Sequence, residues 1–331
     1  MNTPRIMENT IAKGKIHVQT ENIFPIIKKF LYSDHEIFLR ELVANAVDAS
    51  QKLKTLAAVG EFNGDIGRLL IEVDVNKDKK TITIKDRGIG MTSDEVIKYI
   101  AQIAISGAEE FVSKYKEKAD SQIIGKFGLG FFSAFMVSKK VEIFSLSHKE
   151  GSKGVRWECD GNPEYIMEEV ERSERGTEIV LHVAEDSEEF LEKSRIDDLL
   201  KKYCRFLPIE IKSGTTKNYP KEYLDKTWEE KQAIEKEGKK PEMIEEDNII
   251  NNPHPAWIKK PSELKDEDYD KFYSELYPGS FDKPLFHIHI NVDFPFNLTG
   301  ILFFPKIGRT FEPNKEKIQL YCRQEIGRAH V

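Results

Sequence analysis

Residues 41–49 of this chain read ELVANAVDA, and this stretch decides the fold of the part around it. Apolar residues recur near it at three- and four-residue steps, the spacing that places side chains on one face of an α-helix; they are Leu39, Leu42, Val43, Ala46 and Leu53. Glu41, Asn45 and Asp48 fall on nearly the opposite face. Two interpretations stay open for that face, an acid-biased solvated surface or a polar site.

A second motif follows a predicted β-hairpin. Residues 69–75 (LLIEVDV) and 81–85 (TITIK) alternate apolar and polar side chains, with a turn between them. Asp86 comes directly after the second strand, and Gly88 and Gly90 follow it. Glycine lets a ligand approach the main chain closely, and a buried Asp can accept a hydrogen bond from an amine such as that of adenine. The alternative is an ordinary strand-to-loop turn, in which Asp and Gly are common.

The third motif is glycine-rich and precedes a predicted apolar helix. Residues 124–135 read IGKFGLGFFSAF, with the G-x-x-G-x-G spacing. The string lacks the Gly-Lys-Ser/Thr ending of a Walker A loop and the preceding strand of a dinucleotide fingerprint. Glycines at a helix start expose backbone N–H groups to anions. The alternative is a flexible loop before a buried helix.

Together the three motifs predict a nucleotide site. One helix supplies polar groups, one acid after a strand reads the base, and one glycine-rich string meets the phosphates. Thr177 adds a fourth element, because it opens the predicted strand at residues 178–183 and its hydroxyl is placed to reach a nucleotide. Each motif alone is weak evidence for a nucleotide site, but the three motifs in this order are specific evidence for one.

In this order the motifs resemble those of the ATPase superfamily of gyrase B, heat-shock protein 90, sensor histidine kinases and MutL. The residues of the glycine-rich string resemble the corresponding motif of the heat-shock protein 90 family, in particular that of its bacterial branch. The resemblance runs from about residue 21 to about residue 323, with support from residues 20–33, 36–41 and 103–107. It implies an α/β (α+β) fold, in which a two-layer sandwich ATP-binding domain precedes a partial α/β middle domain.

The resemblance also implies a role for each site residue. Glu41 would be the general base that polarises the water attacking the γ-phosphate, Asn45 would hold Mg²⁺ through its side-chain oxygen, and Asp86 would accept the adenine amino group. Catalysis would be positioning and charge stabilisation, as in other phosphoryl transfers. The other implied nucleotide contacts are Gly90, Met91 and Thr177 around the base, with Asp48 near the same pocket, and Gly125, Gly128, Gly130 and Phe131 along the phosphates.

Two positions depart from the family pattern near residues 101–125, which would form a lid over ATP. Tyr99 stands where many relatives have Asn, and Ile105 stands where many have Lys. The resemblance therefore leaves two auxiliary nucleotide contacts unassigned in this chain.

Length, charge and cysteine content bound the class of protein. A chain of 331 residues suggests two domains. The 50 Lys and Arg against 57 Asp and Glu give a net charge of −7, which disfavours nucleic acid and membrane surfaces as partners. Three scattered cysteines suit a reducing compartment, and the first ten residues contain no apolar signal core, so we expect a cytoplasmic protein.

The expected domains are an N-terminal ATP-binding domain at residues 1–214, a charged linker at 215–247 and a truncated middle domain at 248–324. Residues 228–236 of the linker can also form a solvated helix. Residues 325–331 (EIGRAHV) do not fit the family pattern, and we expect them to be a non-native tail. His287 and His289 share a strand face, but without a third ligand in reach they are expected to be ordinary strand residues.

The predicted function is that of an ATP-dependent molecular chaperone, an ATP hydrolase with unfolded or partly folded client proteins. The alternative is a DNA-linked ATPase of the gyrase B or MutL type, which the glycine-rich string and the acidic charge disfavour. The family's γ-phosphate arginine and dimerisation domain lie beyond the part that this chain resembles. We therefore expect a monomer with slow ATP turnover, whereas full-length relatives form homodimers.

Overall fold

The structure is a computed structural model of the chain. It describes residues 34–102, 106–115, 123–125, 128–162, 164–278, 282–292, 298–304, 321–322 and 325–326. Ile105 and much of the expected lid lie outside the described residues, as does most of the expected tail. Of that tail, Glu325–Ile326 is described as strand β12, which pairs with β11 (Tyr321–Cys322).

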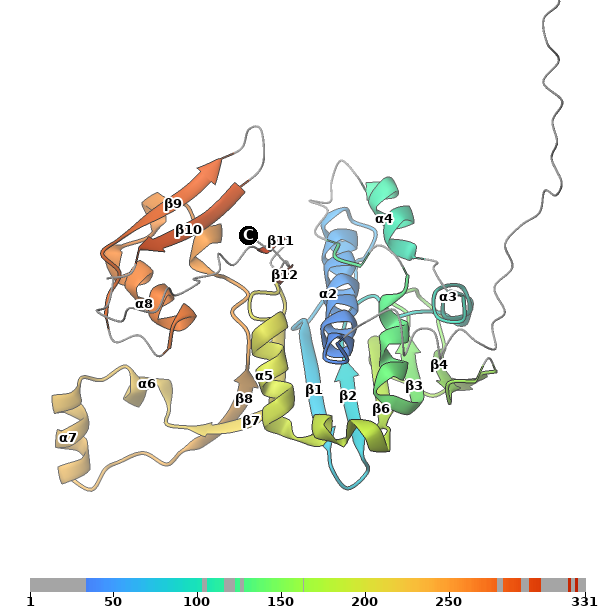
Figure 1. Cartoon of the computed structure of the whole chain (residues 1–331), viewed down its shortest axis with the longest axis horizontal. Coiled ribbons are helices and arrows are strands. Elements are labelled where there is room, and N and C mark those ends of the chain that lie inside the picture. The colour runs from blue at the N-terminus through green and yellow to red at the C-terminus, as the bar shows by residue number, and fades with distance from the viewer. Residues whose placement is uncertain are drawn as a thin grey trace, which may run out of the picture.

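An eight-stranded sheet in the order β5-β4-β3-β6-β2-β1-β7-β8 forms the body of the molecule (Figure 1). Neighbouring strands are antiparallel except for the parallel pair β1 and β7. The strands are β1 (Leu70–Asn76), β2 (Thr81–Lys85), β3 (Ser138–Leu146), β4 (Gly154–Cys159), β5 (Ile166–Val170), β6 (Gly176–Val183), β7 (Glu210–Asn218) and β8 (Ile244–Ile249). The predicted hairpin at residues 69–85 is confirmed as β1 and β2.

Helices cover one face of this sheet, so that the domain has two layers (Figure 1). They are α2 (Ile37–Ala58), α3 (Ser93–Tyr99), α4 (Gly107–Tyr115), α5 (Lys193–Tyr203) and the 3-10 helices η3 (Gly130–Met136) and η4 (Glu185–Leu191). The predicted apolar stripe of α2 is confirmed, because Leu39, Leu42 and Val43 are fully buried against the sheet. Burying one such side chain contributes roughly 1.5–3 kcal/mol.

The other face of the sheet is polar. On β3, Val141 and Ile143 enter the core, whereas Glu142 between them accepts hydrogen bonds from Arg156 of β4. This alternation, one face apolar and one face solvated, is typical of antiparallel sheets.

The apolar residues after the glycine-rich string form a helix, as predicted, but of the 3-10 type. All six residues from Phe131 to Met136 are buried in η3. Phe131 packs edge-on against Trp157 of β4 with ring centroids 5.7 Å apart, which fixes the helix to the sheet.

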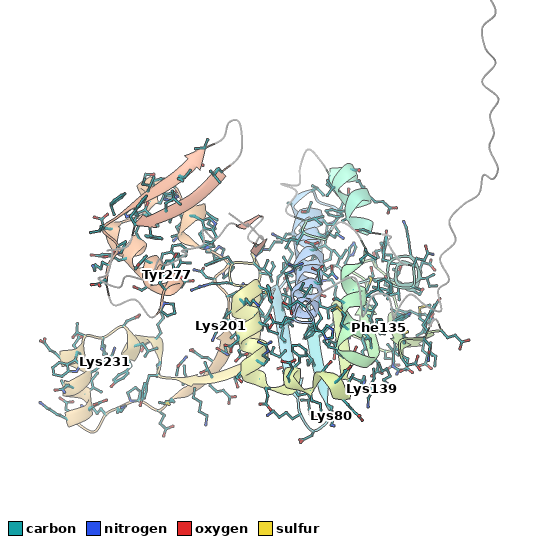
Figure 2. The ribbon with its side chains drawn as sticks, in the orientation of Figure 1. Lys80, Phe135, Lys139, Lys201, Lys231 and Tyr277 are labelled. Atoms are coloured by element: carbon teal, nitrogen blue, oxygen red, sulfur yellow. The ribbon has the colours of Figure 1, made fainter. Side chains whose placement is uncertain are left out.

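The expected linker contains regular structure. The outer ends of β7 and β8 pair across it, with Thr215 opposite Asp247, and between them lie α6 (Lys221–Leu224) and α7 (Trp228–Lys236). No residue of α7 is buried, as expected for a solvated helix. Figure 2 shows Lys231 of this helix far from Phe135 in the core. The domain division at residues 214 and 247 stays a prediction.

The residues after β8 build a second, smaller body from short 3-10 helices η5 (Ala256–Ile258) and η6 (Pro261–Glu263), helix α8 (Asp266–Leu276) and the hairpin β9 (Phe286–Val292) and β10 (Leu298–Phe304). Tyr269 of α8 stacks on His287 at 3.8 Å and bonds His289 Nδ1 at 2.9 Å, so both histidines pack between helix and hairpin. Within the described part of the chain, no helix has the length and apolar character needed to cross a bilayer.

Asn251 fastens the junction between the two bodies. Its Oδ1 accepts from the Ile211 N–H at 2.7 Å, and its Nδ2 donates to the carbonyls of Leu207 and Ile209 at 2.8 Å each. The side chain is buried, so water cannot replace these partners.

Asn251→Ala is expected to lower the free energy of unfolding by about 1–3 kcal/mol, because it leaves buried backbone groups unsatisfied. Asn248→Ala is the matched control, since Asn248 makes one bond of this kind, to Ser213 O at 3.1 Å. Urea unfolding followed by circular dichroism measures both, and equal losses in the two variants would contradict the role of Asn251.

Candidate functional site

A cavity of about 800 Å³ lies between α2, α3, α4, the glycine-rich string and the sheet. All the residues predicted to form the nucleotide site line it: Glu41, Asn45, Asp48, Asp86, Gly90, Met91, Gly125, Gly128, Gly130, Phe131 and Thr177. The structure thus brings together motifs that are more than 130 residues apart along the chain. Their roles toward a ligand remain predictions.

The polar face of α2 forms one wall of the cavity. Arg40 donates from Nε and a terminal nitrogen to Oε1 of Glu41, at 3.2 and 2.5 Å. Oε2 of Glu41 is the oxygen that faces the glycine-rich string, because a Cβ added to Gly130 would lie 2.9 Å from it. A side chain at Gly130 would therefore displace Glu41.

Asp48 fastens the start of the glycine-rich string to α2. Its two carboxylate oxygens accept the backbone N–H groups of Ile124 and Gly125, each at 2.8 Å. A Cβ at Gly125 would lie 3.2 Å from Oδ1 of Asn45. The Gly125 amide that was predicted to meet a phosphate is thus bonded to a carboxylate of the protein.

Asp86 lies at the floor of the cavity, where β2 ends. The residue is only 5% exposed, and its Oδ1 accepts the Gly88 N–H at 2.7 Å. Burial raises the pKa of this carboxyl to about 7, although the Gly88 N–H bond and the charges of Arg172 and Arg175 oppose the shift.

The two glycines after Asp86 are required by close backbone approaches. Gly90 has a φ of +59°, and a Cβ there would lie 1.9 Å from Leu146 O. A Cβ at Gly88 would lie 2.5 Å from the carbonyl carbon of Ala49 in α2. The turn is therefore clamped between α2 and β3.

A hydroxyl pair continues the floor beside Asp86. Ser145 Oγ and Thr177 Oγ1 lie 2.9 Å apart, and the Met91 N–H donates to Ser145 at 2.9 Å. The backbone carbonyl of Thr177 accepts the Asp86 N–H at 2.8 Å. Thr177 thus supports Asp86 and Met91 from β6, which gives the predicted fourth element a structural basis.

Lys52, which is not among the predicted site residues, lines the cavity one turn after Asp48. Its helical spacing from Asp48 places it on the same face of α2, so the pattern of that face could have indicated it. Burial lowers the pKa of Lys52, while Asp48 and Glu95 act to raise it. Its Nζ lies 5.8 Å from the ring centroid of Phe111 in α4.

The raised pKa of Asp86 makes a testable contribution to stability. An acid whose pKa is 3.8 when unfolded and about 7 when folded stabilises the fold below pH 4, and this contribution disappears as pH rises through 7. The difference corresponds to roughly 4 kcal/mol at most. Asp86→Asn removes it, so we expect the variant to gain stability relative to the original chain between pH 5 and 8. Urea unfolding at four pH values tests this, and parallel profiles would contradict it.

Two family models match consecutive parts of the chain. The model described as "Histidine kinase-, DNA gyrase B-, and HSP90-like ATPase" matches residues 32–179, which carry all of the predicted site. The model described as "Hsp90 protein" matches residues 189–326.

Curated relatives extend the same similarity over nearly the whole chain. A "Chaperone protein htpG" of Bacteroides fragilis is 61% identical over 314 residues, which are 95% of this chain and 43% of the relative. The corresponding protein of Porphyromonas gingivalis is 54% identical over 94% of this chain and 43% of its own length. That of Bacillus subtilis is 38% identical over 89% of this chain and 46% of its own length. The chain spans slightly less than half the length of these relatives. An ATPase model of the type shared by histidine kinases and DNA gyrase B and an adjoining Hsp90 model thus match successive parts of the chain, which is similar to Hsp90 proteins over most of its length.

Proposed function

We propose that this chain is the nucleotide-binding part of an ATP-dependent molecular chaperone, and that its cavity binds ATP with Mg²⁺ and hydrolyses it. The observation that carries the proposal is the convergence of Glu41, Asn45 and Asp86 in one cavity of about 800 Å³. The Hsp90 match at residues 189–326 favours the chaperone over a DNA-linked ATPase of the gyrase B or MutL type.

Asp86 would select adenine. Its second carboxylate oxygen can accept the exocyclic amine, while Gly88 holds the first at 2.7 Å. Because such a bond favours the ionised carboxylate, binding should lower the pKa of Asp86 and release a proton near neutral pH.

The phosphates would lie between the glycine-rich string and the first turns of α2. Gly128, Gly130 and the start of η3 would offer backbone N–H groups to the phosphates. The Gly125 N–H is available to a phosphate only if its hydrogen bond to Asp48 breaks. Asn45 would hold Mg²⁺, since an amide oxygen is a hard ligand and Mg²⁺ takes most of its ligands from water and phosphates. The ion would supply neutralisation of phosphate charge.

Glu41 would orient the attacking water. Arg40 holds Oε1, and Oε2 faces Gly130, where the phosphates are expected. The glutamate is therefore fixed in orientation before substrate arrives, which is the kind of preorganisation that positioning catalysis requires.

The proposal also covers the client proteins, the oligomeric state and the cellular location. Unfolded or partly folded proteins are the proposed clients, and homodimerisation is proposed for the full-length relatives. The 331-residue chain itself is expected to be monomeric with slow turnover. The three cysteines are scattered along the chain, which supports a cytoplasmic location.

Asp86→Asn tests the binding site. We expect the Kd for ADP to rise by about 10- to 150-fold, the equivalent of roughly 1.5–3 kcal/mol for a lost charged hydrogen bond. Isothermal titration in two buffers of different ionisation enthalpy should also show proton release by the original chain and none by the variant. Asp78→Asn, in the exposed β1–β2 turn, is the matched control. Unchanged ADP affinity in Asp86→Asn would refute the assignment.

Glu41→Ala tests the chemistry separately from binding. Nucleotide affinity should stay nearly constant, and steady-state phosphate release should fall by about 10²-fold or more, as for loss of a general base. Glu192→Ala is the control, because that exposed carboxylate pairs with Lys77 on the surface. Phosphate release that persists in Glu41→Ala would place the base elsewhere.

A further inference from the structure

The chain contains three Lys-Tyr dipeptides, and each forms the last two residues of a helix. They are residues 98–99 of α3, 114–115 of α4 and 202–203 of α5. In each, the ammonium nitrogen lies over the ring of the following tyrosine, at 5.0, 4.7 and 4.6 Å from the centroid. Each dipeptide also binds one glutamate: Glu110 of α4, Glu61 after α2 and Glu36 before α2, respectively.

The first dipeptide holds α4 near its N-terminal end. Lys98 Nζ and the Tyr99 hydroxyl both bond the carboxylate of Glu110, at 2.8 and 3.1 Å. The Tyr99 ring also lies against Gly107, where an added Cβ would be 3.0 Å from the ring. The close packing explains why the first residue of α4 is a glycine.

The second dipeptide holds α4 at its other end. Lys114 Nζ and the Tyr115 hydroxyl donate to the same oxygen of Glu61, at 2.9 and 2.5 Å. Glu61 follows the end of α2, so this grip ties α4 to the helix that carries the polar face of the site.

Helix α4 depends on these bonds to Glu110 and Glu61 because few of its described side chains are buried. Among its described side chains, only Ala108 and Tyr115 are buried, whereas α2 buries twelve residues. Yet α4 forms a wall of the cavity, through Gly107, Ala108, Glu110, Phe111, Lys114 and Tyr115. A wall with few buried contacts opens more readily than the rest of the domain.

We propose that residues 98–99 and 114–115 are positioning pairs that hold α4 against the cavity and thereby set the rate at which the cavity admits and releases its ligand. The proposal rests on the proposed function for the identity of that ligand, an adenine nucleotide. The bonds made by these pairs contact α4 rather than the floor of the site. Breaking one should therefore speed entry and release together.

Tyr99→Phe and Tyr115→Phe test the proposal, because each removes a hydroxyl bond to a glutamate and keeps the ring. Tyr203→Phe is the matched control: it removes the same kind of bond, 3.0 Å from Tyr203 to Glu36, at a helix end remote from α4. Amide hydrogen exchange of the nucleotide-free protein should become roughly two- to fivefold faster in α4 for the first two variants and stay unchanged there for the control. Exchange in α4 that is identical in all three variants would overturn the proposal.

Stopped-flow binding of a fluorescent ADP analogue gives the second readout. The association and dissociation rate constants of Tyr99→Phe should rise by the same factor, so that the Kd stays constant. Faster dissociation with unchanged association would mean that Tyr99 contacts the nucleotide itself, which also overturns the proposal. If the original chain binds no nucleotide, the proposed function fails, and the exchange of α4 still decides whether the pairs hold this helix.

Discussion

The whole site depends on how α2 is oriented about its own axis. Leu39, Leu42 and Val43 are fully buried against the sheet, and this burial leaves the helix only one stable rotation. The opposite face, with Glu41, Asn45 and Asp48, is thereby turned into the cavity. A helix rotated by one residue, about 100°, would expose leucines and withdraw the polar groups. The burial that stabilises the core therefore also fixes the direction in which the polar face of α2 points.

Two carboxylates of the site have different surroundings. Asp48 accepts two N–H groups at 2.8 Å from residues 124 and 125, so it fixes the glycine-rich string. Burial raises the pKa of Asp86 to about 7 and outweighs its backbone hydrogen bonds with Gly88 and Thr177, which act to lower it. A carboxyl that is costly to ionise in the free protein gains most from a ligand that donates to it. The same burial that destabilises the empty site therefore favours a ligand with an amine.

Periodicity in the sequence was sufficient for the elements that bury one face. It predicted α2 and the β1–β2 hairpin, and the family motifs predicted which residues would line the cavity. Periodicity could not predict contacts between residues that are far apart in the sequence. Nothing local indicates that the outer end of β7 pairs with β8 across a charged segment, or that Asp48 meets the Gly125 amide. Lys52 is different, since its helical spacing from Asp48 was visible in the sequence and was overlooked.

The cavity is bounded by walls of unequal stability, and this inequality bears on how a ligand enters. The walls made by α2 and the sheet rest on fully buried core side chains, so they open less readily than the wall made by α4. The wall made by α4 is held chiefly at its ends, by the carboxylates of Glu110 and Glu61. Exposed bonds of this kind are individually weak and are screened by salt. Ligand exchange should therefore pass on the α4 side, while the groups that read the base and orient the water stay fixed on the rigid side.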